Sequence, residues 1–314
     1  MNALRAYYFF VFAMYAVVIP HYQVFLRASG FTPAGVGLMI GFFEIFGVVG
    51  PMVLGRIADR TGRFRELKVG ATLLAALFLV FLLGRPPFAV ALLLSACTGG
   101  LFKVSVPLTD AVAGDVLSDP REQYGQVRVF GSIGFAVAGV AVPLFSLVDE
   151  GSPKSMMIAF LASMALFAAV VSLVPPPGRK RLPEDNLPDG GGAPSTTSGG
   201  LTSLSPRFWS VVAALSVGNI AFGAYNSFFS LYLQEELGVR GVTLYWAIGA
   251  VSEIPIIFFS GRLIRRFGIG PLLAASGGIM ALRLLLYSFA PTLPLVVLIQ
   301  TLHAVTFGIM LSAG

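Results

Sequence analysis

The sequence predicts an all-α polytopic membrane protein whose helices form two related bundles. Of its 314 residues, 56% are hydrophobic and only 11% are charged, and the mean hydropathy is +0.84. A soluble globule of this composition would have too little polar material to cover its surface. Ten apolar runs approach the roughly 20 residues that a helix needs to cross a bilayer. Two similar stretches, beginning at residues 55 and 261, indicate an internal repeat.

Six apolar runs precede a long polar insertion and four follow it. The first six lie at 6–27, 34–55, 67–84, 88–113, 127–148 and 155–174. The other four lie at 208–233, 242–261, 269–289 and 292–313. The insertion, 175–207, is rich in Pro, Gly, Ser and Thr, so we expect a flexible cytoplasmic linker. The predicted domains are a six-helix bundle at 1–174 and an incomplete bundle of four helices at 208–314.

The basic residues indicate the orientation, because Lys and Arg accumulate in cytoplasmic loops. With the N-terminus inside, fifteen of the 21 Lys and Arg residues lie in cytoplasmic segments. Four lie in outer segments (Arg27, Arg85, Lys154 and Arg240) and two lie within spans (Lys103 and Arg283). Both ends of the chain are therefore expected in the cytoplasm. The net charge of +6 reflects this topology, with anionic lipid headgroups rather than nucleic acid as partners.

The repeat follows the second and the eighth runs. The chain reads G-R-I-A-D-R-T-G at 55–62 and G-R-L-I-R-R-F-G at 261–268, and both fit G-R-x-x-x-R-x-G. Each copy follows a run with a central glutamate, Glu44 or Glu253. Chance similarity of two basic loops is the alternative. If the repeat is complete in the whole protein, we expect twelve spans, of which this chain holds ten.

The first copy, extended to Arg63, matches the loop signature G-x-x-x-D-R-x-G-R of the major facilitator superfamily. Four further stretches resemble its 3-phenylpropionate permease branch, near the lactose and nucleoside proton symporters. They are P-L-T-D-A at 107–111, R-V-F-G-S-I-G-F at 128–135, E-I-P at 253–255 and L-H-A-V-T-F-G at 302–308. The resemblance implies the fold of that superfamily, alternating access, proton symport and an aromatic carboxylate substrate. It places a gating motif at Gly55, Asp59, Arg60, Gly62 and Arg63, with Arg128 beside it. A solvated basic loop is the plainer interpretation of the arginines alone.

Ionisable residues within spans are candidates for the transport machinery, because a charge in hydrocarbon is costly. Glu44 and Glu253 lie near the midplane, where desolvation should let a carboxyl bind and release a proton; a structural hydrogen bond or ion pair is the alternative. Lys103 and Asp110 are seven residues apart, which predicts that they share a helix face. Lys103 is expected to bind a substrate carboxylate or to pair with Glu44, and Asp110 to pair with Arg128 or to carry protons.

Two histidines and an arginine complete the set. His303 lies level with Glu253 and suits a proton relay, although a packing role is common for a lone membrane histidine. Arg283 is expected either to snorkel toward the outer face or to contact substrate. His21, near the outer end of the first span, suits a gate or a surface position. The weaker candidates for substrate contact are Tyr22, Asn219, Tyr225 and Asn226.

The function expected from these residues is secondary transport, in which a small organic anion moves together with protons. Alternatives are a sugar or nucleoside proton symporter, a truncated membrane protein that does not transport, and a membrane enzyme or sensor. The enzyme is disfavoured, because no G-x-x-x-x-G-K or H-E-x-x-H motif occurs. Two histidines and one cysteine predict neither metal nor cofactor. We expect a monomer in a bacterial-type inner membrane.

Overall fold

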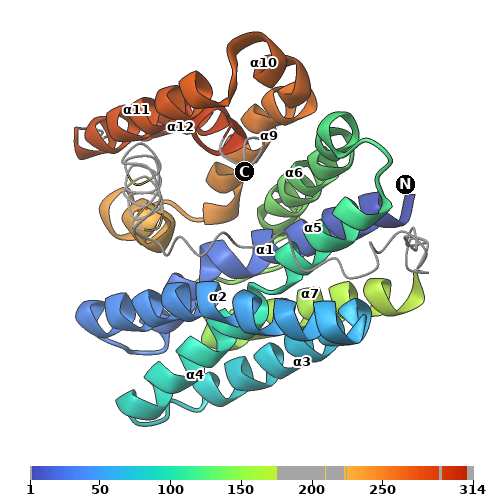
Figure 1. Cartoon of the computed structure of the whole chain (residues 1–314). Helices are drawn as coiled ribbons and strands as arrows, with labels where there is room; N and C mark the ends of the chain where they lie inside the picture. The colour runs from blue at the N-terminus through green and yellow to red at the C-terminus, as the bar shows by residue number, and fades with distance from the viewer. Residues whose placement is uncertain (1, 175–208, 210–222, 224, 290–291, 310–314) are drawn as a thin grey trace.

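The computed structural model describes residues 2–174, 209, 223, 225–289 and 292–309, which are helical wherever they are regular. Figure 1 shows the arrangement of the helices. In the first half they are α1 (Asn2–Ala28), α2 (Pro33–Thr61), α3 (Phe64–Leu83), α4 (Phe88–Phe102), α5 (Ser105–Val116), α6 (Pro120–Leu144) and α7 (Pro153–Leu173). In the second half, residues 225–231 are helical. They lead into the π-helical turn η3 (Tyr232–Glu236), α9 (Val242–Phe258), α10 (Ser260–Phe267), α11 (Ile269–Ser288), α12 (Leu293–Thr301) and the π-helical turn η4 (Ala304–Gly308).

The described helices confirm an all-α membrane protein. Seven are long and apolar enough to cross a bilayer, and α9 with α10 makes an eighth if the bent pair is one span. The run predicted at 208–233 lies mostly outside the described residues, and Leu293–Gly308 is a shorter apolar segment. The count of ten spans therefore stays a prediction, as do the domain limits around the linker at 175–207, which also lies outside the described residues.

The helices gather around two apolar cores. The larger core belongs to α1 to α7, and α1 is buried along most of its length because it packs against α6, α7 and α9. The smaller core joins Tyr225, Phe229, Trp246, Val296 and Ile299 in the second half. In Figure 1, α9 to α12 lie above α2, α3, α4 and α7, with α1 and α6 between them. The helices α6 and α9 pack side by side and form the main contact between the halves.

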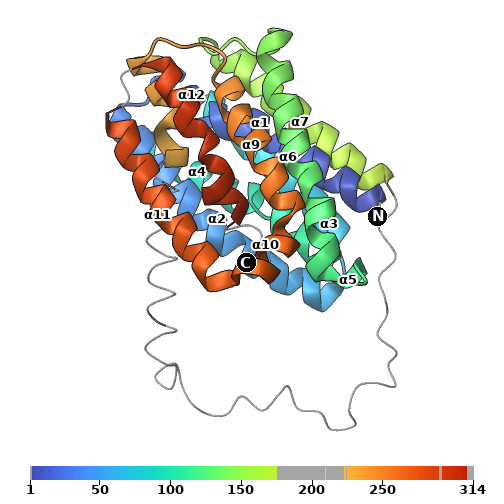
Figure 2. The ribbon, with the colours of Figure 1, turned by 90° about the horizontal axis from the view of Figure 1, so that it is seen from above.

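The two ends of the molecule are named here after the predicted topology. The inner end carries α5 and α10, which lie at the same end in Figure 2, together with the α2–α3 connection. The outer end carries the connections at 29–32, 84–87, 145–152 and 237–241.

Three predicted runs are interrupted. The run 88–113 is split at Lys103 and Val104 into α4 and α5, where Pro107 has no N–H to bond the carbonyl of Lys103. The run 242–261 bends by 61° between α9 and α10, one turn after Pro255 removes a helix hydrogen bond. The last run forms α12 and then η4. The first and the third of these interruptions place side chains of the candidate site.

The repeated motif lies in a helix rather than in a loop. The helix α2 runs through Gly55 and Asp59 to Thr61, six residues beyond the predicted limit, and ends at Gly62 with φ of 70°. A left-handed glycine is a common helix ending because it has no Cβ. In the second copy, α10 ends at Gly268 with φ of 77°. The two copies share the glycine that ends the helix, although only the second follows a bend.

Glycines bring α2 and α4 into close contact. A Cβ at Gly50 would overlap the backbone of Gly100, and a Cβ at Gly99 would overlap the backbone of Phe43. A Cβ at Gly47 would overlap the side chain of Lys103. Small residues allow this approach between membrane helices. The packing directs Lys103 across α2 toward the centre of the molecule.

Candidate functional site

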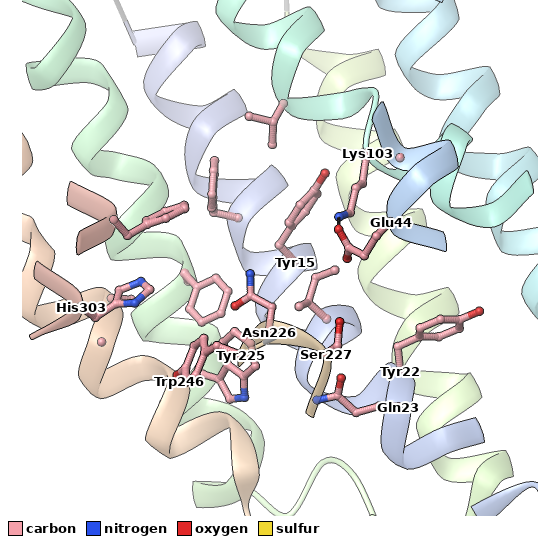
Figure 3. Close-up of a pocket in the computed structure, with 18 of the residues that line it drawn as sticks. Tyr15, Tyr22, Gln23, Glu44, Lys103, Tyr225, Asn226, Ser227, Trp246 and His303 are labelled. Atoms are coloured by element: carbon pink, nitrogen blue, oxygen red, sulfur yellow. Dashed lines mark hydrogen bonds and ion pairs between the residues drawn. The ribbon is translucent and has the colours of Figure 1, made fainter. Parts of the chain in front are cut away.

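A cavity of about 520 Å³ lies between the two halves. Residues of α1, α2, α5 and α6 line it from the first half, and residues 225–227, α9, α12, His303 and η4 line it from the second. Much of the lining is aromatic, which suits a ring-containing or otherwise apolar molecule. Its aromatic side chains include Phe12, Tyr15, Phe43, Phe135, Tyr225 and Trp246. Figure 3 shows Lys103 and Glu44 on one side of this cavity and His303 on the other.

The carboxylate of Glu44 pairs with Lys103. Lys103 Nζ donates a hydrogen bond to Glu44 Oε2, and the ammonium group also lies 5.4 Å from the centre of the Phe43 ring. The two side chains are 36% and 23% exposed, both at the cavity wall. Of the two interpretations of Lys103, pairing with Glu44 is the one that the structure contains. The pair presents no net charge to a ligand.

Glu253 lies on the opposite wall and is held by the other half of the molecule. Its side chain is 6% exposed, and Ser132 Oγ on α6 donates a 2.6 Å hydrogen bond to its Oε1. Its Oε2 lies 3.6 Å from His303 Nε2 and accepts no hydrogen bond from a described residue. A carboxyl with so few donors and so little water is suited to binding a proton.

His303 joins Glu253 to a buried arginine. Arg283 Nη1 lies 3.0 Å from His303 Nδ1, and because arginine only donates, Nδ1 must accept. A neutral His303 therefore carries its proton on Nε2, which faces Glu253. His303 also stacks on Phe307, with ring centres 5.1 Å apart.

Arg283 is fully buried in the second half. It donates a 2.6 Å hydrogen bond to Gln300 Oε1 and lies 4.2 Å from the centre of the Tyr225 ring. Gln300 Nε2 in turn donates to the Tyr225 hydroxyl at 2.6 Å. The expectation that Arg283 snorkels to the outer face is wrong, because these polar and aromatic partners hold it in the interior. Gln300, His303 and Tyr225 separate it from the cavity, which Arg283 does not line.

Arg128 is a buried cation without a hydrogen-bond partner among the residues that the structure describes. Only 1% of the residue is exposed, it lines the cavity, and none of its three guanidinium nitrogens has a hydrogen-bond partner among the described residues. Its guanidinium lies 3.9 Å from the centre of the Phe12 ring and 5.7 Å from that of Tyr8. Arg128 belongs to the cavity rather than to the inner loop motif beside which the sequence analysis placed it.

The predicted Asp110–Arg128 pair is wrong. Asp110 Oδ1 accepts hydrogen bonds from the hydroxyls of Tyr8 at 2.5 Å and Tyr124 at 3.1 Å, and Tyr8 lies between it and Arg128. The break at Lys103 and Val104 disrupts the continuous helix that the seven-residue spacing assumed. Lys103 therefore lines the cavity while Asp110 lies outside it.

Three of the four weaker substrate candidates line the cavity, namely Tyr22, Tyr225 and Asn226. The hydroxyl of Tyr22 lies 2.6 Å from Ser95 Oγ, which donates to the carbonyl oxygen of Met39. The fourth, Asn219, lies outside the described residues. In the loop motif, Asp59, Arg60 and Arg63 are exposed. Sequence reasoning missed Ser132, Gln300 and Trp246, although Ser132 and Gln300 are polar residues in apolar runs.

The described residues contain no group of three His, Cys, Asp or Glu side chains that could hold a metal ion. The groups that line this cavity include two cations, two carboxyls, an imidazole and aromatic rings. Such groups can bind an anion and can bind a proton.

The MFS_1 like family model matches residues 1–314. The "Probable 3-phenylpropionic acid transporter" of Escherichia coli strain K12 is 27% identical over 305 residues, which cover 96% of this chain and 78% of the relative. The maltose permease of Geobacillus stearothermophilus is 28% identical over 306 residues, covering 96% and 75%. The crystal structure of the nucleoside transporter NupG matches with a TM-score of 0.72 at 16% identity, covering 100% of this chain and 80% of that one.

Proposed function

The chain belongs to the MFS_1 like family, and on that premise we propose that it moves a small aromatic carboxylate together with a proton across the membrane. The observation that carries the proposal is Arg128, a buried cation that has no hydrogen-bond partner among the described residues and lies at the wall of an aromatic cavity. Leaving such a cation unpaired is costly. A substrate carboxylate would supply the missing partner.

The cavity offers such a substrate a cation for its carboxylate and aromatic side chains for its ring. The guanidinium of Arg128 can take a carboxylate through two parallel hydrogen bonds. Phe12, which covers the guanidinium at 3.9 Å, would move aside and join Tyr15 and Phe43 around the ring of the substrate. Lys103, the anchor expected from the sequence, is engaged by Glu44, so Arg128 takes over that role.

Proton coupling follows from the placement of Arg128 and Glu253 on either side of Ser132. Arg128 and Ser132 are four residues apart on α6, hence on one face about one turn apart, and Ser132 holds Glu253. The charge of Arg128 favours the ionised form of Glu253. A substrate carboxylate cancels that charge, so that Glu253 takes up a proton as the anion binds. His303 is the group through which this proton enters or leaves.

The proposed transport cycle is one of alternating access, in which the cavity opens to one side of the membrane at a time. Each half contributes one wall of the cavity, and the Ser132–Glu253 bond crosses between the halves. Rocking of one half against the other would expose the cavity to either side and would break or remake that bond. We place the protein in a bacterial inner membrane as a monomer, with both ends of the chain in the cytoplasm and the basic loops against anionic headgroups.

The test is uptake by the purified protein in liposomes under an imposed inward proton gradient. Labelled 3-phenylpropionate should accumulate, and its neutral amide should not. Maltose and uridine represent the sugar and nucleoside alternatives raised by the relatives. Accumulation of either sugar or nucleoside, with no uptake of the carboxylate, would overturn the substrate assignment. Uptake that ignores the proton gradient would overturn the coupling.

A further inference from the structure

A second cluster of titratable groups joins the two halves at the outer end, and its two members, His21 and Glu150, are not among the residues that line the cavity. Its centre is Glu150, in the connection between α6 and α7. The carboxylate accepts hydrogen bonds from the backbone N–H of Val242 at 2.9 Å and of Gly241 at 3.2 Å, and from Gln234 Nε2 at 2.8 Å. All three donors belong to the second half.

Glu150 thereby caps the N-terminus of α9, the helix that carries Glu253. The first N–H groups of a helix have no partner within the helix, and its N-terminus attracts negative charge. Burial opposes ionisation of Glu150, but the neighbouring His21 and the hydrogen bonds from Val242 and Gln234 outweigh it and lower the pKa of this carboxyl below its ordinary 4.5. Glu150 is therefore an anion at neutral pH in this arrangement.

His21, on α1, faces the same carboxylate. Its side chain is fully buried, its Nδ1 lies 2.8 Å from the carbonyl oxygen of Val17, and its Nε2 lies 3.5 Å from Glu150 Oε1. Both neighbours are acceptors. A neutral imidazole has only one N–H, so either tautomer would turn a lone pair toward an oxygen. The protonated ring donates in both directions and satisfies both.

We propose that His21 and Glu150 form a second proton-binding site, and that a proton held there closes the outer end of the transporter. With the proton bound, Glu150 links the imidazolium of the first half to the N-terminus of α9 in the second. Without it, a lone pair faces a buried carboxylate and the closed arrangement loses stability. The proposal relies on the alternating access described above, but not on the substrate or on proton binding at Glu253.

The other charged residues at this end of the described structure do not pair with Glu150, so His21 is the counterion of Glu150. Arg27 pairs with Glu235 at 2.9 Å across the same end, and Asp149 accepts the N–H of Gly151 at 3.0 Å. No ion pair of the described residues joins a further charge to His21 or Glu150. The remaining charges at this end lie on the surrounding connections and helix ends: Arg85, Lys154, Glu236 and Arg240. The charged residues of α2, α5, α6 and α9 lie deeper or at the inner end.

The pH window follows from the two groups. Because the closed arrangement is the one in which the His21–Glu150 site holds its proton, alkaline pH should remove that proton and favour the open outer end. Linkage of one proton changes the ratio of closed to open molecules by at most about tenfold per pH unit. At the acid limit, the contribution of Glu150 is present above pH 4.5 and is lost as the pH falls through its lowered pKa. Closure should therefore be strongest at mildly acid pH, above the range in which Glu150 itself takes up a proton.

The experiment measures the distance across the outer end with spin labels, in nanodiscs and without substrate. Labels at Leu147→Cys and Thr292→Cys, in a Cys97→Ser background, use exposed uncharged positions in the two halves. The short distance should dominate at pH 5.5, and the ratio of short to long distances should fall at least tenfold by pH 8.5. His21→Gln and Glu150→Gln should each remove this pH response. The matched control Arg27→Gln, which breaks the neighbouring exposed pair, should lower the closed fraction at every pH without changing the midpoint.

A distance distribution that does not change between pH 5.5 and 8.5 in the parent would overturn the proposal, whatever the variants do. So would a pH response that persists in both His21→Gln and Glu150→Gln, because it would then belong to the Glu253 cluster. Either result leaves the proposed transport function standing, since that function is tested separately by uptake.

Discussion

Glu44 on α2 and Glu253 on α9 line the same cavity from the two halves, yet their surroundings differ. Glu44 pairs with Lys103 of its own half and is 36% exposed at the cavity wall. Glu253 is 6% exposed, is bonded to Ser132 of the other half and faces His303. A carboxyl at the cavity wall therefore does not have the same role in each half. A carboxyl neutralised within one half can stay ionised throughout a cycle, whereas one held across the interface changes partners whenever the halves move.

Of the substitutions predicted here, Glu253→Gln should cause the largest loss, and the quantity lost is proton-driven accumulation of substrate. The amide cannot exchange a proton but can still accept the hydrogen bond from Ser132. Accumulation driven by a proton gradient should therefore fall about 100-fold, as expected for loss of a proton-transferring group, while exchange of labelled for unlabelled substrate continues. Uptake and counterflow in the same liposomes measure the two. Retained accumulation would assign the proton to another residue.

Next in size is Arg128→Gln. A hydrogen bond to a charged group contributes about 1.5–3 kcal/mol, so the Kd for 3-phenylpropionate should rise roughly 10- to 100-fold. Arg128→Lys should give an intermediate loss, because an ammonium cannot form the bidentate pair. Calorimetric titration measures both. Affinity for the neutral amide should hardly change, and an equal loss for acid and amide would mean that Arg128 acts on the shape of the cavity instead.

Breaking the Glu44–Lys103 pair should reduce uptake less than the two preceding substitutions reduce transport or binding. A second substitution should restore that uptake. Glu44→Gln leaves the Lys103 ammonium without its partner, and uptake should fall about tenfold, since a half-buried cation is costly unpaired. Removing both charges, with Glu44→Gln and Lys103→Met together, should restore uptake to within about threefold of the parent. If the double variant were as inactive as Glu253→Gln, Glu44 would have a role in proton transfer and the contrast between the two glutamates would fail.

The smallest effect concerns stability rather than transport. Gly99→Ala would force α2 and α4 apart, because its Cβ would overlap the backbone of Phe43. Such overpacking costs about 1–3 kcal/mol and should lower the Tm measured in detergent. Gly278→Ala on α11 is the matched control, since its Cβ would meet no atom within 4 Å, and alanine favours a helix over glycine. Equal Tm values for the two variants would contradict this packing.

Much of the fold could be predicted from the sequence, because a bilayer dictates the length and apolarity of each span. The breaks could not, since the gap at Lys103 and the bend after Phe258 depend on Pro107 and Pro255 within runs that stay apolar. The pairing of Glu44 with Lys103 was one of two expectations. The shared face predicted for Lys103 and Asp110 failed because helical spacing does not extend across such a break, and the Asp110–Arg128 pair failed because Tyr8 and Tyr124 bond to Asp110 instead.

The residues of the site could be predicted only in part, because the contacts between helices cannot be read from the sequence of any one helix. Glu253, His303 and Tyr225 are conspicuous as polar groups in apolar runs, but their partners come from other helices. Ser132 acquires its role from the packing of α6 on α9. Glu150 is one acidic residue in a polar loop until the start of α9 lies beside it. Neither the Ser132–Glu253 contact nor the contact of Glu150 with the start of α9 is indicated by a pattern in the local sequence.

The most direct test of the central claim, that Glu253 rather than Glu44 carries the coupled proton, is proton flux driven by substrate. Liposomes containing the protein and a trapped pH indicator receive an inward gradient of 3-phenylpropionate, with protein-free liposomes correcting for passive entry of the acid. We predict acidification of the interior by the parent and by the Glu44→Gln, Lys103→Met double variant, and none by Glu253→Gln. Acidification by Glu253→Gln at the rate of the parent would contradict the account.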